Sequence, residues 1–348
     1  MENEAIKLTQ FSEGSGCGCK IAPAILEEIL SGSQTWQRPD ANLLVGNHQK
    51  DDAAVYQLSP DLAMINTVDF FTPIVDDPYD FGRIAAANAL SDVYAMGGVP
   101  IFANAVLSWP VEKLAPALAA KVLEGAKSIC QQAGVTIAGG HSIAAKDPIF
   151  GLSVCGTIHP QNIKSNSTAQ EGDLIYLTKK IGIGVLATAL KRGKINPEDY
   201  QEMVNTACQL NSIGQHLGQQ DFVHAMTDVT GFGLLGHLIE TCEGAGLSAD
   251  LHFKDIPLIK GVQSYIDQFI FPDNTYRNWN AYSPKTSGVN GMELVHLCDP
   301  QTSGGLLVAI DPAQQAAFET LMQIEQSPAY LIGNYKAAGE KVVDVLIA

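Results

Sequence analysis

The stretch NTVDFFTPIVDDPYDFGRIAAANALSDVYAMGG, residues 66–98, decides the fold of this chain. It opens with the end of an apolar, β-rich run, crosses a polar turn, and continues as an alanine-rich segment that a pair of glycines closes. Asp69 ends the predicted strand, and Asp92 lies near the end of the predicted helix, four residues after Asn88 and on the same helix face. Because an uncompensated carboxylate in a close-packing helix costs several kcal/mol, Asp92 indicates a polar site.

The alternation of short strands and helices continues on both sides of this stretch. In the first half, strands are predicted at 42–46, 52–58, 61–71, 101–109, 135–143 and 149–158, and helices at 81–98 and 111–132. In the second half, the prediction is a strand at 173–179, a helix at about 183–192, a helical region, a strand at 222–228, a helix within 230–246, and a loop feeding a strand within 297–310. This alternation indicates an α/β or α+β layered fold.

A polar, turn-rich segment, HPQNIKSNSTAQEGD at 159–173, separates the two halves. We therefore expect one domain at 1–168 and a second, α/β domain at 169–348. Residues 1–48 begin with a stretch rich in glycine and serine and contain a second loop-like segment, so they are expected to form a mobile arm ahead of the first strand. Both halves contain strand–loop–helix units with aspartate at strand ends, which makes a related architecture of the halves plausible.

Composition excludes several classes of protein. The 348 residues are 46% hydrophobic and 17% charged, as in a well-packed globular protein. The net charge of −16 argues against a nucleic-acid binder, and any anionic ligand would need bound metal to reverse the local field. No run approaches 18 unbroken apolar residues, so no membrane association is expected. Because the first residues lack the features of a signal peptide, we expect a cytoplasmic protein.

Four aspartates lie at hinges between predicted elements: Asp52, Asp69, Asp92 and Asp228. Any one of them, like the adjacent Asp51, can be read as a helix cap or turn residue. If they converge, their repulsion must be offset, because two unit charges about 4 Å apart repel by roughly 4 kcal/mol at an effective dielectric of about 20. Magnesium is the natural partner, since it is held by a few carboxylates together with substrate phosphates.

Two glycine-rich segments are expected to supply further phosphate contacts. AGGHS at 138–142 overlaps the strand predicted at 135–143 and is also a candidate glycine-rich loop, and TGFGLLG at 230–236 is predicted as a turn that opens a helix. Neither matches a Walker A loop or a complete dinucleotide-binding fingerprint. A tight turn explains each segment equally well, and His141 can also be a structural histidine.

The sharpest local feature is SGCGCK at 15–20. Lys20 is three residues after Cys17, so its charge favours the thiolate, a form that suits a nucleophile or a carrier of sulfur or selenium. The alternatives are a flexible tail whose cysteines have no role and half of a zinc site, for which a second cysteine pair is missing. The role of Cys19 stays open. The remaining cysteines are predicted to be small core residues: Cys130, Cys155, Cys208, Cys242 and Cys298.

These motifs resemble the selenophosphate synthetase (selenide, water dikinase) family nearly from end to end. The similarity is carried by LTQFSEGSGCGCKI at 8–21, LLVGNHQKDDAAVY at 43–56, the stretch at 66–98, IAGGHSI at 137–143, AMTDVTGFGLLGHL at 225–238 and CDPQTSGGLL at 298–307. The resemblance implies a fold like that of aminoimidazole ribonucleotide synthetase, with the N-terminal halves paired in a homodimer. It also implies a reaction of ATP, selenide and water that yields selenophosphate, AMP and phosphate, and so supplies selenium for selenocysteine and selenouridine.

The resemblance also implies roles for individual residues. Cys17 and Lys20 match the catalytic cysteine and lysine, Lys20 also serving the nucleotide. Magnesium would be held by Asp52, Asp92 and Asp228. The nucleotide would also be contacted by the following residues: Gln49, Lys50, Asp51, Asp69, Asp92, Gly140, His141 and Ser142. The domain at 1–168 would bind ATP and magnesium and dimerise, and its arm would be catalytic.

Two other functions remain possible on the residues alone. A synthetase or kinase of the same fold could phosphorylate a purine or thiamine precursor, but an ordinary hydroxyl or amide acceptor does not call for a thiolate. A non-enzymatic selenium or metal carrier could use Cys17 and Cys19, but would leave the aspartates without a purpose. Whether the selenium donor is free selenide or a protein-bound perselenide is not decided by the sequence.

Overall fold

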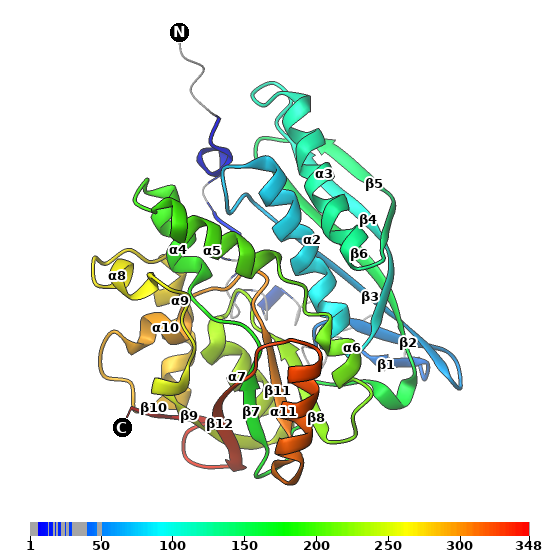
Figure 1. Cartoon of the computed structure of the whole chain (residues 1–348), viewed down its shortest axis with the longest axis vertical. Coiled ribbons are helices and arrows are strands. Elements are labelled where there is room, and N and C mark those ends of the chain that lie inside the picture. Colours follow the sequence, from blue (N-terminus) through cyan, green and yellow to red (C-terminus); the bar gives the residue numbers. More distant parts are fainter. Residues whose placement is uncertain are drawn as a thin grey trace.

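The computed structural model describes residues 6–12, 14–16, 18, 20–21, 25, 28–29, 40–46 and 51–347. Two mixed sheets with covering helices make up the fold (Figure 1). The strands are β1 (Leu43–Val45), β2 (Ala54–Ser59), β3 (Leu62–Phe71), β4 (Val99–Trp109), β5 (Thr136–Ala144), β6 (Ile149–Ile158), β7 (Leu174–Leu177), β8 (Val223–Asp228), β9 (Leu247–His252), β10 (Thr286–Ser287), β11 (Leu306–Ile310), β12 (Tyr330–Ala337) and β13 (Val343–Leu346). The helices are α2 (Pro78–Ala95), α3 (Pro116–Gln132), α4 (Ile183–Lys191), α5 (Pro197–Cys208), α6 (Ile213–Leu217), α7 (Gly233–Ala245), α8 (Val262–Ile266), α9 (Asn274–Tyr282), α10 (Glu293–Cys298) and α11 (Gln315–Ile324).

In the first half, strands pair in the order β1-β2-β3-β6-β4-β5. Helices α2 and α3 cover one face of this sheet (Figure 1). They approach closely because Gly82 and Gly125 lack side chains: an added Cβ would lie 1.8 Å from the Val122 carbonyl oxygen and 1.9 Å from that of Tyr79, respectively. This close packing fixes α2, the helix that carries Asp92, against the sheet.

The opposite face of this sheet has no covering layer within the described residues. Burial alternates along β3, so that Ile65 is buried under α2 while its neighbours Met64 and Val68 point to the other side. Val68 is 54% exposed and Phe70 is 50% exposed, and Ile101 on β4 is 49% exposed. We call this surface the open face; it is an apolar area in a place where a solvent-facing sheet normally carries polar residues.

In the second half, strands pair in the order β10-β13-β9-β12-β7-β11-β8. The sequence LLVAI of β11 is buried at every residue, because α7 packs on one face of the sheet and α6 and α11 pack on the other. Strand β8 lies at the edge beside β11 and ends at Asp228. The two halves are not separate cores: α4, α5 and α8 contribute to the same apolar cluster as α2.

The expected α/β (α+β) class with two layered halves is confirmed. Two details of the prediction are wrong. The strand predicted at 135–143 is confirmed as β5, so AGGHS belongs to that strand and is not the loop that was also predicted for it; Gly140 lets the strand approach β4 so closely that an added Cβ would lie 2.2 Å from the Ala105 carbonyl oxygen. The second helix starts at Pro116, not at 111, since Pro occupies the first helical turn and residues 111–114 form turns.

Four of the five described cysteines are buried, as predicted for core residues, and all five are unpaired. Cys155 is the exception, because it is half-buried on the open face and lies opposite Asn66 in the β3–β6 register. None of the described helices combines the length and apolar character needed to cross a membrane.

Candidate active site

The first part of the site is a matched pair of contacts between β3 and α2. The Thr67 hydroxyl donates a hydrogen bond of 2.5 Å to Asp92. In the opposite direction, the Asn88 side-chain amide donates a hydrogen bond to Asp69. Two residues along a strand span about 6.6 Å and four residues along a helix span about 6 Å, so the pairs 67/69 and 88/92 have the same spacing. Each carboxylate is thereby oriented by a neutral side chain from the facing element.

The second half of the chain joins this cluster through Asp228. The Ser91 hydroxyl on α2 donates a 2.5 Å hydrogen bond to Asp228 at the end of β8. Asn211 supports the contact, since its amide donates to the Ser91 hydroxyl at 2.7 Å and to the Gly304 carbonyl at 2.8 Å. A strand end from the second half is therefore attached to a helix of the first half next to Asp92.

Asp52 completes the group from the segment before β2. Its Oδ1 accepts a 2.9 Å hydrogen bond from the Thr227 hydroxyl, whereas its Oδ2 is buried without a hydrogen-bond partner. Asp51 also has a buried Oδ2 without a hydrogen-bond partner, but its Oδ1 accepts two hydrogen bonds of 2.8 Å, from the Ser165 hydroxyl and the Asn166 backbone amide. Asp51 therefore ties the start of β2 to the segment between the halves, which fits the turn-residue alternative for this position.

The four carboxylates are close enough to repel one another. Burial raises the pKa of Asp92 well above its usual range, and the charges of Asp69, Asp228 and Asp52 raise it further. Burial followed by the Asp228 charge does the same to the pKa of Asp52. The pKa of Asp228 is raised to about 6, chiefly by burial, against the opposing effects of the Ser91 hydrogen bond and the Lys20 charge. Without a cation, this group of side chains holds protons that it would not hold in water.

A divalent cation fits this donor set. The buried, unpartnered Oδ2 of Asp52 is an oxygen that a cation would satisfy, and bound positive charge would offset the burial and the repulsion that together raise the three pKa values. Within the described residues, no three acidic, histidine or cysteine side chains are close enough to form a complete metal cage. A Mg²⁺ ion here would therefore take part of its ligands from water and substrate phosphates, as Mg²⁺ usually does.

Lys20 faces the carboxylates from the arm. Its ammonium lies 3.9 Å from Asp69 Oδ1. The described residues around it are anchored: the Gly16 amide donates to the Thr72 carbonyl at 3.1 Å, and the Asn274 amide donates to the Gly18 carbonyl at 2.5 Å. Cys17, Cys19, Gln49 and Lys50 lie outside the described residues, so their predicted roles, like the mobility of the arm, stay predictions.

Sequence reasoning missed a second tier of residues that hold the carboxylates in place. Lys179 is buried and donates to the Gln209 carbonyl at 2.6 Å and to the Ser303 carbonyl at 2.9 Å, and the Ser303 amide donates to Asn88. Burial lowers the pKa of Lys179 to about 7. The only available signal was a lysine at the end of an apolar strand, which does not reveal its partners.

The glycine-rich turn after β8 opens a helix, as predicted. Helix α7 begins at Gly233, and the turn before it is braced by His237, whose Nε2 accepts a 3.0 Å hydrogen bond from the Thr230 backbone amide. Burial lowers the pKa of His237 to about 3, so the ring is neutral and able to accept. The turn is thus fixed beside Asp228.

Gly140, His141 and Ser142 are not part of this cluster within one chain. They lie on β5, an edge strand separated from β3 by β6 and β4, and all three are exposed. His141 lies opposite Val106 in the β4–β5 register, and the buried Ala105 next to Val106 points toward the helices. His141 is therefore on the open face.

Comparison with known proteins places the chain in a family. The sequence model described as AIR synthase related protein, N-terminal domain matches residues 50–158, and the corresponding C-terminal domain matches residues 170–345. The selenide, water dikinase of Colwellia psychrerythraea (strain 34H) is 51% identical over 342 residues, which cover 98% of this chain and 99% of that protein. The chain belongs to the selenide, water dikinase family. The Cronobacter sakazakii selenide, water dikinase is 50% identical over 347 residues, covering 99% of this chain and 100% of its own length.

The fold of this dikinase-family chain is shared with enzymes that carry other names. The crystal structure of thiamine-monophosphate kinase from Stenotrophomonas maltophilia K279a superimposes with a TM-score of 0.65 at 18% identity, over 94% of this chain and 96% of that one. At this identity the likeness concerns the fold alone. The two domain matches leave out residues 1–49, whereas the similarity to the dikinases extends over nearly the whole chain. That extent favours the dikinase family over a kinase for a purine or thiamine precursor.

Proposed function

We propose that this chain makes selenophosphate: ATP, selenide and water are converted to selenophosphate, AMP and phosphate. The observation that carries the proposal is the convergence of Asp52, Asp69, Asp92 and Asp228, from four separate segments, at a point that Lys20 also reaches. A protein of net charge −16 can bind the phosphates of ATP through its carboxylates, because the cation that the carboxylates hold reverses the local field. The selenide, water dikinase relatives supply the identity of the acceptor.

In this proposal each described residue has a definite task. Asp52, Asp92 and Asp228 would hold Mg²⁺, which would supply charge neutralisation to the phosphates of ATP. Thr67, Ser91 and Thr227 orient these carboxylates through their hydroxyl groups. The orienting role of the hydroxyl groups follows from the hydrogen bonds that they donate to the carboxylates.

Lys20 is the cationic partner of the reaction in this proposal. It stabilises negative charge on the transferred γ-phosphoryl group or on the incoming selenide, and Asp69 orients its ammonium. Cys17 presents or activates selenium from the same segment. Transfer of the γ-phosphoryl group to selenium leaves ADP, whose hydrolysis while enzyme-bound then yields AMP and phosphate.

The product set tests this function. Purified protein supplied with ATP, Mg²⁺ and reduced selenium without oxygen should form AMP, phosphate and selenophosphate in equal amounts, because one ATP gives one of each. Phosphorus NMR identifies all three products. ADP as the final nucleotide, with no selenium–phosphorus species, would favour a kinase for another acceptor. Absence of magnesium-dependent ATP affinity would favour a selenium carrier.

The proposal includes a homodimer formed through the open face. The exposed apolar residues of β3 and β4 give a second copy an extended surface to cover, and an isologous pairing would bury it on both subunits. His141 lies on that same face, away from the carboxylates of its own chain. The nucleotide role of Gly140, His141 and Ser142 is therefore proposed to be exercised on the site of the other subunit. The assembly is proposed to be cytoplasmic.

Val68→Arg tests the dimer. Val68 is 54% exposed and lies in the middle of the open face, so an arginine there should be tolerated by the monomer but should introduce like charges across a two-fold interface. We expect analytical ultracentrifugation to give a monomer and the affinity for ATP to fall at least about tenfold. Lys121→Glu, on exposed α3 of the opposite side, is the matched control and should remain a dimer. A Val68→Arg dimer of wild-type affinity would refute the arrangement.

A further inference from the structure

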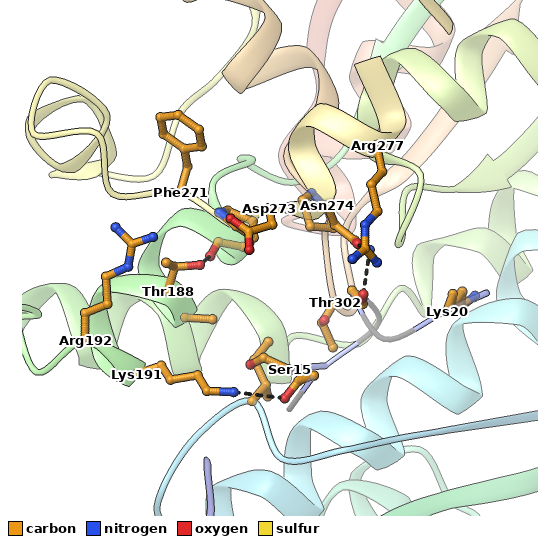
Figure 2. A pocket seen from close by; sticks show the side chains of 17 residues that line it. Ser15, Lys20, Thr188, Lys191, Arg192, Phe271, Asp273, Asn274, Arg277 and Thr302 are labelled. Carbon is orange, nitrogen blue, oxygen red and sulfur yellow. Dashed lines mark hydrogen bonds between the residues drawn. The ribbon is translucent and has the colours of Figure 1, made fainter. Parts of the chain in front are cut away.

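A cavity of about 490 Å³ lies next to the carboxylate cluster and is not used by any role assigned above. Its walls come from the arm near Ser15, the last two turns of α4 and the start of α9 (Figure 2). Lys20 lines this cavity and also contacts Asp69. It is therefore the one described side chain that these contacts place in both the cavity wall and the carboxylate cluster.

The cavity wall is cationic in an acidic protein. Among the described residues that line it, the charged side chains are Lys20, Lys191, Arg192 and Arg277 against one acid, Asp273. The whole chain has 21 lysines and arginines against 37 aspartates and glutamates, so a ratio of four to one is the reverse of the overall balance. Lined by one sign of charge, a concave surface concentrates ions of the opposite sign.

The two arginines are positioned by neutral groups. Arg192 donates to the Phe269 carbonyl at 3.2 Å, and Arg277 donates to the Asn274 side-chain oxygen at 3.2 Å. Neither forms an ion pair with an acid in the part of the chain that the structure describes. Figure 2 shows Arg192, at the end of α4, and Arg277, on α9, at the two sides of the cavity, with Asp273 between them. Their charge is therefore directed at the hollow rather than neutralised by the protein.

Lys191 has a second task, because it secures the arm that forms the cavity wall. Its ammonium donates to the Ser12 carbonyl at 3.0 Å and to the Gly14 carbonyl at 3.4 Å. Removing Lys191 would therefore disturb the wall as well as its charge. Arg192 and Arg277 are exposed and form no hydrogen bond with the described residues of the arm, so they are the residues through which the charge can be tested.

We propose that this cavity is the entry vestibule for the phosphoryl acceptor, a small chalcogenide anion such as hydrogen selenide. The inference rests on the proposed function, in which an anion must meet the γ-phosphoryl group from a side that the leaving ADP does not occupy. The carboxylate cluster lies on one side of Lys20, where magnesium and the ATP phosphates would block the approach of that anion. The cationic cavity is on the other side and would attract it, so the anion reaches Lys20 through the vestibule.

Charge substitutions test the vestibule by steady-state kinetics with selenide as the varied substrate. We expect Arg192→Gln and Arg277→Gln each to raise the KM for selenide about threefold, and the double variant about tenfold, because each removes one attracting charge. Asp273→Asn removes the single acidic side chain among the described residues of the cavity wall, and it should lower the KM for selenide by about twofold. The KM for ATP and the affinity for magnesium–ATP should not change in any of these variants.

Lys194→Gln is the matched control, since Lys194 is exposed just beyond α4 and does not line the cavity. It should leave the KM for selenide unchanged. Rising salt should weaken kcat/KM for selenide less in the double variant than in the parent, because fewer charges are left to screen. A double variant with the parent's KM for selenide, or with only kcat reduced, would overturn the vestibule, the latter pointing to product release. Failure of the parent protein to form AMP with selenide would instead refute the proposed function.

Discussion

Asp228→Asn should lower selenide-dependent AMP formation by roughly a thousandfold, because a neutral amide replaces the carboxylate that would hold Mg²⁺ against the phosphates. The substitution preserves shape, and the Ser91 hydroxyl that now donates to Asp228 can donate to the remaining amide oxygen. We therefore expect the variant to fold. Calorimetric titration with ATP should show that magnesium no longer strengthens nucleotide binding, whereas it does so in the parent protein.

The control for this variant is Asp61→Asn, which removes one negative charge from a side chain that is 89% exposed in the turn between β2 and β3. It should bind magnesium–ATP like the parent. If Asp228→Asn binds ATP equally well with and without magnesium and still matches the parent in affinity, the carboxylates do not act as a metal receptor.

The same carboxylate gives the binding a pH dependence of known sign. The pKa of Asp228 is raised to about 6, mainly by burial, and those of Asp52 and Asp92 are also raised. Below its pKa a carboxyl group is protonated and has to lose the proton before it binds a metal. Magnesium-dependent ATP affinity should therefore weaken in the parent protein as pH falls from about 7 to about 5, and Asp228→Asn, in which magnesium gives no gain in affinity, should show no such fall.

Lys20→Met should reduce kcat for selenophosphate formation by about a hundredfold to a thousandfold while leaving the affinity for magnesium–ATP within about threefold of the parent. Methionine has a similar length but no charge, so it removes the ammonium that lies 3.9 Å from Asp69. The expected separation of kcat from binding follows from placing Lys20 at the developing charge and not among the metal ligands. Quenched-flow measurement of AMP gives kcat, and calorimetric titration gives the affinity.

Two further variants define the charge requirement at position 20. Lys20→Arg keeps the charge and should recover part of the lost turnover. Lys121→Met makes the same chemical change on an exposed residue of α3 and should have no effect. Equal turnover in Lys20→Met and the parent would remove Lys20 from the reaction, and a parallel loss of ATP affinity would make it a nucleotide ligand instead.

The strand–helix unit at 66–98 shows which structural features the local residue pattern can predict. The apolar alternation of β3 and the alanine-rich repeat of α2 are local properties, so their positions were predictable, and so was the shared face of Asn88 and Asp92. The end of β8 at Asp228 was predictable for the same reason. The partners of these residues were not, since Thr67 and Ser91 carry no local signal that separates them from any other small polar residue.

The clearest difference between the prediction and the structure concerns the place of one strand in its sheet. A strand was predicted at 135–143 and a glycine-rich loop within it near His141; the segment is a strand that pairs with β4 and lies at the sheet edge, three strands away from Asp69. Strand order depends on pairing between distant segments, which short-range composition does not encode.

The amino-acid sequence by itself determined the two layered halves, the acidic hinge residues and the reactive segment around Lys20, because propensity, periodicity and charge act over a few neighbouring residues. Only the tertiary structure decided that Thr227 meets Asp52 across 175 residues, and that Arg192 and Arg277 face one cavity. Such meetings depend on strand register and helix packing, which are settled by the whole core at once and not by any single segment.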